Sequence, residues 1–81
     1  MKLPRDVNGE ELARLLGKYG YQTTRQTGSH MRLTSLSKGS EHHVTIPRHA
    51  PLKVGTMNGI LKDAAQYLDI PYLQFIDELF R

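Results

Sequence analysis

Two short segments in the middle of the chain alternate between polar and apolar residues, and they constrain the fold more than any other feature. Residues 30–35 place Met31 and Leu33 on one side, and residues 42–47 do the same with Val44 and Ile46. A period of two residues is typical of a β-strand with one face buried and the other in water. Residues 21–27 are rich in Thr and predict a third, half-exposed strand. One face of this sheet must therefore be covered by other parts of the chain.

Helical patterns flank these strands on both sides. Asn8, followed three residues later by Glu11, fits a helix N-cap with its capping-box partner, and Gly20 fits the left-handed position that ends a helix. After the strands, Thr56 is expected to cap a second helix and Asp69 to start a last one. The apolar residues expected to face inward from these helices are Leu12, Leu15, Leu16, Tyr19, Met57, Ile60, Leu61, Ala64, Leu68, Leu73, Ile76, Leu79 and Phe80. The order α-β-β-β-α predicts an α+β domain in which helices cover one face of a three-stranded antiparallel sheet.

Composition narrows the class of protein. The 81 residues suffice for one domain, so we expect a single unit over residues 1–81. The chain has no cysteine, and no apolar run approaches the roughly 20 residues of a membrane span, so we expect a cytoplasmic protein. Residues 1–53 carry nine basic and four acidic side chains, whereas residues 54–81 carry two and four. This basic first part suits an anionic partner such as nucleic acid, although a soluble basic surface without a partner has the same composition.

His30 is the residue best placed for chemistry. It directly follows the turn signal Gly28-Ser29, and it shares the solvent-facing side of its strand with Arg32. An imidazole can move a proton near neutral pH, and an arginine can hold a phosphate oxygen. Together they suit work on a phosphodiester. The plainer alternative is that His30 is an ordinary surface histidine at a turn.

The other histidines could be interpreted as metal ligands. His42 and His43 are adjacent on a strand, so their side chains point to opposite faces and cannot both bind one ion without a bulge. His49 follows after the strand ends, and no cysteine is present to complete a zinc site. We therefore expect no metal and no cofactor, with His42 partly covered and His43 in solvent.

Several motifs, in their order and spacing, resemble the HicA (YcfA-like) family, the toxin half of a bacterial toxin–antitoxin pair. The resemblance covers nearly the whole chain. It rests on residues 7–12 (VNGEEL), 20–21 (GY), 25–30 (RQTGSH), 43–47 (HVTIP) with His49, 52–56 (LKVGT) and 60–62 (ILK).

The resemblance implies a fold similar to a double-stranded-RNA-binding domain and a ribonuclease that cuts messenger RNA to arrest translation. It implies that His30 is the essential histidine, with Gly28 and Ser29 as its supporting motif. It also implies an antitoxin partner of the HicB type that covers the active face in a hetero-oligomer. Many members carry a second histidine directly after the first, where this chain has Met31. In addition to His30, the residues that we expect to contact RNA are Arg25, Arg32, Lys38, His43 and Arg48.

Two other functions fit the same sequence. A non-catalytic RNA-binding module of the same fold would read RNA by shape, but such modules carry a lysine-rich cluster at the start of their last helix. Here residues 55–59 read GTMNG, with only Lys53 nearby, which favours single-stranded RNA as substrate. The second alternative is a protein-interaction domain with no RNA role, which would show negligible RNA affinity at physiological salt.

Overall fold

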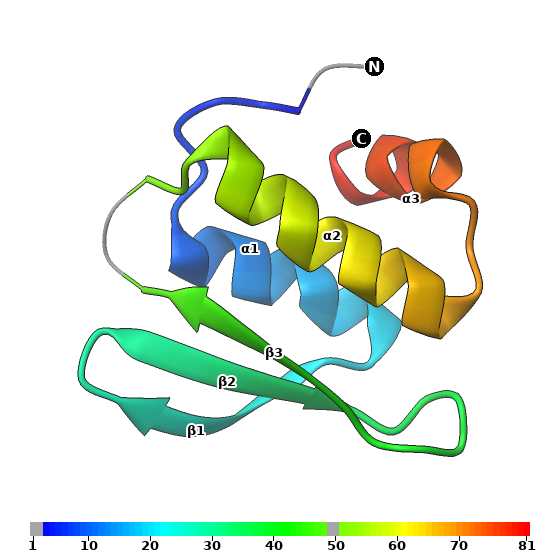
Figure 1. Cartoon of the computed structure of the whole chain (residues 1–81), viewed down its shortest axis with the longest axis horizontal. Coiled ribbons are helices and arrows are strands. Elements are labelled where there is room, and N and C mark those ends of the chain that lie inside the picture. The colour runs from blue at the N-terminus through cyan, green and yellow to red at the C-terminus, as the bar shows by residue number, and fades with distance from the viewer. Residues whose placement is uncertain (1–2, 49–50) are drawn as a thin grey trace.

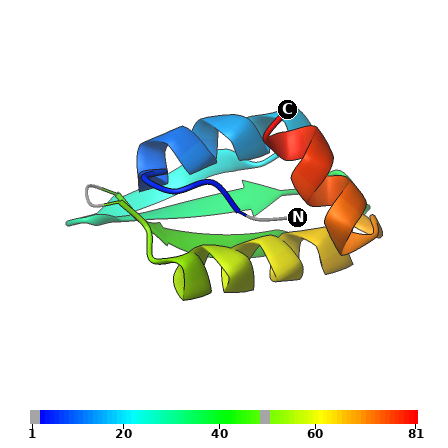
Figure 2. The same ribbon diagram turned by 90° about the horizontal axis from the view of Figure 1, so that it is seen from above.

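The computed structural model describes residues 3–48 and 51–81. Its strands form one antiparallel sheet in the order β1-β2-β3 (Figure 1). The elements are α1 (Gly9–Leu16), a 3₁₀ turn (Gly17–Tyr19), β1 (Gln22–Thr27), β2 (His30–Ser35), β3 (His42–Pro47), α2 (Val54–Leu68) and α3 (Tyr72–Leu79). Figure 2 shows α1 and α2 side by side over the sheet, with α3 across one end. The predicted α+β architecture is confirmed. No helix within these described residues has the length and apolar character needed to span a bilayer.

The alternating strand residues divide between the two faces as predicted. Met31, Leu33, Val44 and Ile46 are all buried beneath the helices. From the helices, Leu12, Leu16, Met57, Leu61, Ala64 and Leu68 are also buried and complete the core between the two layers. The opposite face of the sheet has no covering element among the described residues (Figure 1). The layers therefore leave the polar side chains of the strands in water.

Asn8 caps the first helical segment and Gly20 ends it, as the sequence predicts. The Asn8 side-chain oxygen accepts a hydrogen bond of 2.8 Å from the Glu11 amide and so satisfies a free donor of the first turn. At the other end, Gly20 has φ of 89°, which a residue without a β-carbon adopts at little cost. The chain then enters β1.

The second helix begins earlier than predicted. Thr56 was expected to cap it, but α2 starts at Val54, and Lys53 is the cap residue. The Lys53 carbonyl accepts the first helical hydrogen bond, from the Met57 amide at 2.9 Å. Thr56 therefore lies inside the first turn, and the prediction of its capping role is wrong.

The last helix begins later than predicted, and its buried face differs from the predicted one at two residues. Asp69 was expected to start it, but Asp69 is left-handed with φ of 59° and ends α2. Pro71 caps α3 instead, and its carbonyl accepts from the Phe75 amide at 2.9 Å. Leu73, predicted to face inward, is 63% exposed, whereas Phe75, which was not predicted to face inward, is fully buried. Ile76 and Leu79 are buried as predicted, and Phe80 is partly buried.

Gly9 allows α1 to approach the end of β3. A β-carbon at this position would overlap the Pro47 carbonyl oxygen and would lie 3.0 Å from the Arg48 Cα. We expect Gly9→Ala to destabilise the domain by about 1–3 kcal/mol, because backbone on both sides must separate. Urea unfolding measures this, with Gly17→Ala as the control, since no atom lies within 4 Å of a β-carbon there. Equal stability of the two variants would contradict the close approach.

Candidate active site on the open face of the sheet

The turn that Gly28 and Ser29 form places His30 at the first position of β2. Thr27 and His30 are cross-strand partners, so only two residues connect the strands. Gly28 has φ of 58°, and no atom crowds it, so its conformation rather than its size calls for glycine. The Ser29 carbonyl accepts a 2.7 Å hydrogen bond from the Arg48 amide, which ties the turn to the end of β3. His30 is thus exposed directly after a turn whose backbone is hydrogen-bonded to the residue after β3.

A β-bulge brings Arg25 onto the same face as His30. The pairing register shifts between Thr23 and Arg25, so that Thr23 pairs with Leu33 whereas Arg25 pairs with Arg32. Without the extra residue, positions 23 and 25 would face the same way. The bulge therefore turns Arg25 to the open face, where it lies directly opposite Arg32.

These side chains line a shallow hollow of about 180 Å³ at one end of the open face. The lining residues are Arg25, Thr27, His30, Arg32 and Thr45. The hollow contains two guanidinium groups and no carboxylate, and within residues 3–48 and 51–81 neither guanidinium forms an ion pair. Such a site attracts an anion and offers it several N–H donors beside an imidazole. Alternation along residues 42–47 predicts that Thr45 lies on this face. Thr27 is placed there by its cross-strand pairing with His30.

The open face carries its second histidine at the opposite end. His43 pairs with Thr34, four residues along β2 from His30, which corresponds to roughly 13 Å along a strand. The His43 Nδ1 lies 2.8 Å from the Thr34 hydroxyl, and its Nε2 lies 3.5 Å from a Glu41 carboxylate oxygen. His43 therefore does not stand beside His30 as a second acid or base.

Two further residues expected to contact RNA lie away from the hollow. Arg48 is directed to the helix layer, with its Nε 3.6 Å from a Glu10 carboxylate oxygen of α1. Lys38 lies in the turn between β2 and β3, where its backbone amide donates to the Tyr67 hydroxyl at 3.1 Å. The structure thus groups Arg25 and Arg32 with His30 and separates Lys38 and Arg48 from it. His49 lies outside the described residues.

His42 belongs to a polar network under the helices. Its Nδ1 is 2.6 Å from the Tyr21 hydroxyl, its Nε2 is 3.2 Å from an Asp63 carboxylate oxygen, and its ring stacks on Tyr67 at 4.7 Å between centroids. Burial raises the pKa of Tyr21 far above its ordinary value, so its hydroxyl stays protonated and can donate to the imidazole. This network ties β3 and the residue before β1 to α2. His42 is partly covered, as predicted, and no group of three possible metal-ligating side chains occurs within the described ranges.

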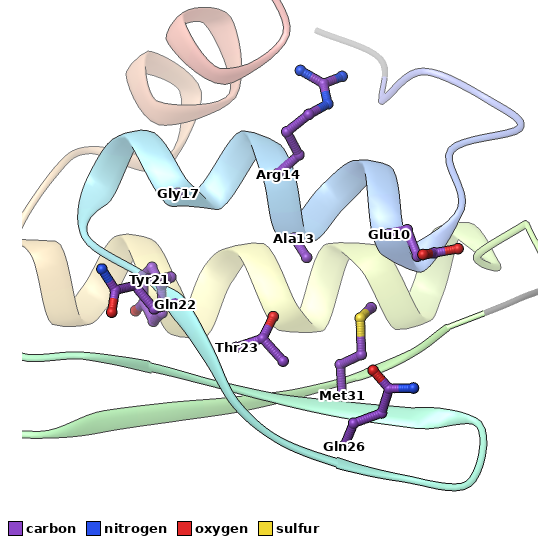
Figure 3. A pocket seen from close by; sticks show the side chains of 9 residues that line it. All are labelled: Glu10, Ala13, Arg14, Gly17, Tyr21, Gln22, Thr23, Gln26 and Met31. Atoms are coloured by element: carbon purple, nitrogen blue, oxygen red, sulfur yellow. The ribbon is translucent and has the colours of Figure 1, made fainter.

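A larger hollow lies on the other side of the sheet. It has a volume of about 530 Å³ and lies between α1 and β1, where the Met31 and Gln26 side chains point from the strands toward the helix (Figure 3). Glu10 and Arg14 of α1 also line it. The Glu10 carboxylate makes this hollow less suited to a phosphate than the one around His30, which no carboxylate lines.

Comparison with known proteins gives one match. A family model described as the HicA toxin of bacterial toxin–antitoxin systems matches residues 9–65 of the 81-residue chain. The matched region includes the whole sheet and the turn before His30. No curated protein and no solved structure matches the chain significantly.

Proposed function

Because the chain belongs to the HicA toxin family, the toxins of bacterial toxin–antitoxin pairs, we propose that it is an endoribonuclease that cuts messenger RNA in the bacterial cytoplasm. The observation that supports this most is the grouping, in one hollow of the open face, of an exposed imidazole with two guanidinium groups that form no ion pair within the described part of the chain. That grouping matches what cleavage of a phosphodiester requires: donors for the phosphate oxygens and a group that moves a proton.

The proposed reaction uses the ribose as its own nucleophile. The His30 imidazole takes the proton of the 2′-hydroxyl, the 2′-oxygen forms a bond to phosphorus, and the bond from phosphorus to the 5′-oxygen breaks. The imidazolium then returns its proton to the leaving 5′-oxygen, so that one histidine serves both steps. The products are a 2′,3′-cyclic phosphate and a 5′-hydroxyl, and the proton count balances.

Arg25 and Arg32 stabilise the charge that develops on the phosphate oxygens. They lie opposite each other across β1 and β2, so a phosphate between them can receive donors from both guanidinium groups. These contacts are to the backbone of the RNA, so they hold a strand without selecting its sequence. The partner antitoxin, which we propose is of the HicB type, would inhibit the enzyme by covering this face.

Single-stranded RNA fits this surface better than a duplex. In residues 51–57, which include the first turn of α2, the only basic side chain is that of Lys53. The start of the helix therefore lacks the lysine cluster that would hold a second RNA strand. The sheet face remains as the main basic surface around the proposed catalytic residue.

The test is cleavage of a labelled single-stranded RNA by the purified protein in the presence of EDTA. We expect cutting without added metal, products with 2′,3′-cyclic phosphate ends, and no cutting where a 2′-deoxynucleotide replaces the ribose at the cleaved bond. RNA that binds but stays intact would instead identify a non-catalytic binding module. No binding even at low salt would leave only the protein-interaction alternative.

A further inference from the structure

The open face continues past the hollow around His30 to an exposed leucine. Leu36 follows β2 directly, in step with the outward residues His30, Arg32 and Thr34 of that strand. Its side chain is 66% exposed although it is apolar. The central strand and the residue after it therefore present four side chains in a row, those of His30, Arg32, Thr34 and Leu36.

Leu36 forms one wall of a second hollow, of about 420 Å³, at the far end of this face. The other residues that line it are Gly20, Gln22, Thr24, Thr34 and Ser37. No charged side chain is among them, in contrast to the two arginines around His30. The ligand of this hollow should therefore be neutral, with an apolar surface and a hydrogen-bonding edge.

Hydrogen bonds within the sheet fix the two threonine side chains of the hollow. The Thr24 and Thr34 hydroxyls are 2.8 Å apart, and the Thr34 hydroxyl is also 2.8 Å from the His43 Nδ1. Gln22, the cross-strand partner of Thr34, also lines the hollow, and its amide can both donate and accept a hydrogen bond. The two threonine hydroxyls are therefore held in place before any ligand arrives.

We propose that this hollow is a nucleobase subsite, in which an unpaired base of the RNA packs on Leu36 and presents its edge to Gln22. This proposal rests on the proposed function. From Arg32 to Leu36 the chain advances about 13 Å, so the base belongs to a nucleotide beyond the one whose phosphate is cut. The RNA strand then runs along β2, with its phosphate between the arginines and a base at the apolar end. A base has an apolar face whatever its identity, so the subsite adds affinity for single strands of any sequence.

Binding of intact RNA tests the subsite. The probe is a fluorescein-labelled single-stranded decanucleotide of mixed sequence, measured by anisotropy with proteins that all carry His30→Ala so that the RNA is not cut. We expect Leu36→Ala to weaken binding by about 3- to 10-fold and Leu36→Phe to preserve or tighten it, because an aromatic ring stacks on a base better than leucine does. The salt dependence should not change with Leu36→Ala, whereas Arg32→Ala should reduce its slope by about one.

A matched control is available on α3. Leu73 is 63% exposed, close to the 66% of Leu36, but it belongs to the helix layer, so Leu73→Ala should leave RNA binding unchanged. Unchanged binding by Leu36→Ala, or an equal loss in Leu73→Ala, would overturn the subsite while leaving the proposed function intact. Weaker binding of the antitoxin without weaker binding of RNA would also overturn it. Failure of every variant to bind RNA at low salt would reject the proposed function, and the subsite with it.

Discussion

Replacement of His30 by alanine is expected to lower the rate of RNA cleavage by about 10²–10⁴-fold, the usual contribution of one positioned acid or base. His30 is exposed at the start of β2 and fills no part of the core, so the variant should remain folded. The RNA should still bind, since Arg25 and Arg32 remain in the hollow. Single-turnover cleavage of a labelled RNA measures the rate, and circular dichroism confirms the fold.

His43→Ala is the matched control because it removes a second histidine from the same face. His43 lies four residues along the sheet from the register position of His30 and contacts Thr34 and Glu41 instead. Its loss should change cleavage only a few-fold through weaker binding. Equal losses in the two variants would assign catalysis to both histidines and contradict the single-histidine reaction.

Expression in a bacterial host gives an independent readout of the same variant. We expect the wild-type protein to arrest growth and deplete messenger RNA, and His30→Ala to do neither at an equal level of soluble protein. Growth arrest by both proteins would mean that toxicity does not come from this imidazole.

The strand pattern was sufficient to predict most of the site. Alternation placed His30, Arg32, Thr34, His43 and Thr45 on one face, and the structure confirms this through the cross-strand pairs of β2 and β3. Alternation works here because one face of each strand is buried, so a shift of one residue would expose the core. Local sequence therefore carried nearly all the information for these two strands.

The position of Arg25 could not be predicted in the same way. All six residues of β1 are exposed, so no apolar pattern records which side faces the helices. The bulge between Thr23 and Arg25 then reverses the alternation, and it becomes visible only through pairing with β2. Its charge and its place in the family motif indicate that Arg25 contacts RNA, but not where its side chain lies. Its position opposite Arg32 is a property of the tertiary fold.

The polar network around His42 has a similar origin. Its members come from β3, from the residue before β1 and from α2, so they are far apart in the chain. Sequence alternation indicated that His42 faces the helix side, but not that Tyr21 and Asp63 would satisfy both ring nitrogens. Partners at this separation depend on how α2 crosses the sheet.

Phe75→Ala is expected to cost about 3–5 kcal/mol of unfolding free energy, which is a large part of the roughly 4–12 kcal/mol available to a chain of this size. Phe75 is fully buried, and its ring packs edge-on against Tyr19 with 4.9 Å between centroids. α3 lies outside residues 9–65, the region shared with the family model. A loss of this size in urea unfolding would show that α3 is nevertheless part of the core.

Leu73→Ala controls for the helix itself, because this exposed residue of α3 should change stability by no more than about 0.5 kcal/mol. A cost below about 1 kcal/mol for Phe75→Ala would mean that α3 is dispensable to the fold.

Comparison of Phe75→Ala with His30→Ala then separates the residues that stabilise the fold from those that cleave RNA. The folded fraction of Phe75→Ala should cleave RNA at the wild-type rate, since α3 packs on the helix side of the sheet (Figure 1), whereas the proposed catalytic hollow lies on its open face. His30→Ala should show the reverse, with stability kept and cleavage lost. If Phe75→Ala and His30→Ala each lowered both the stability and the cleavage rate, the core and the active site would not lie on opposite sides of the sheet.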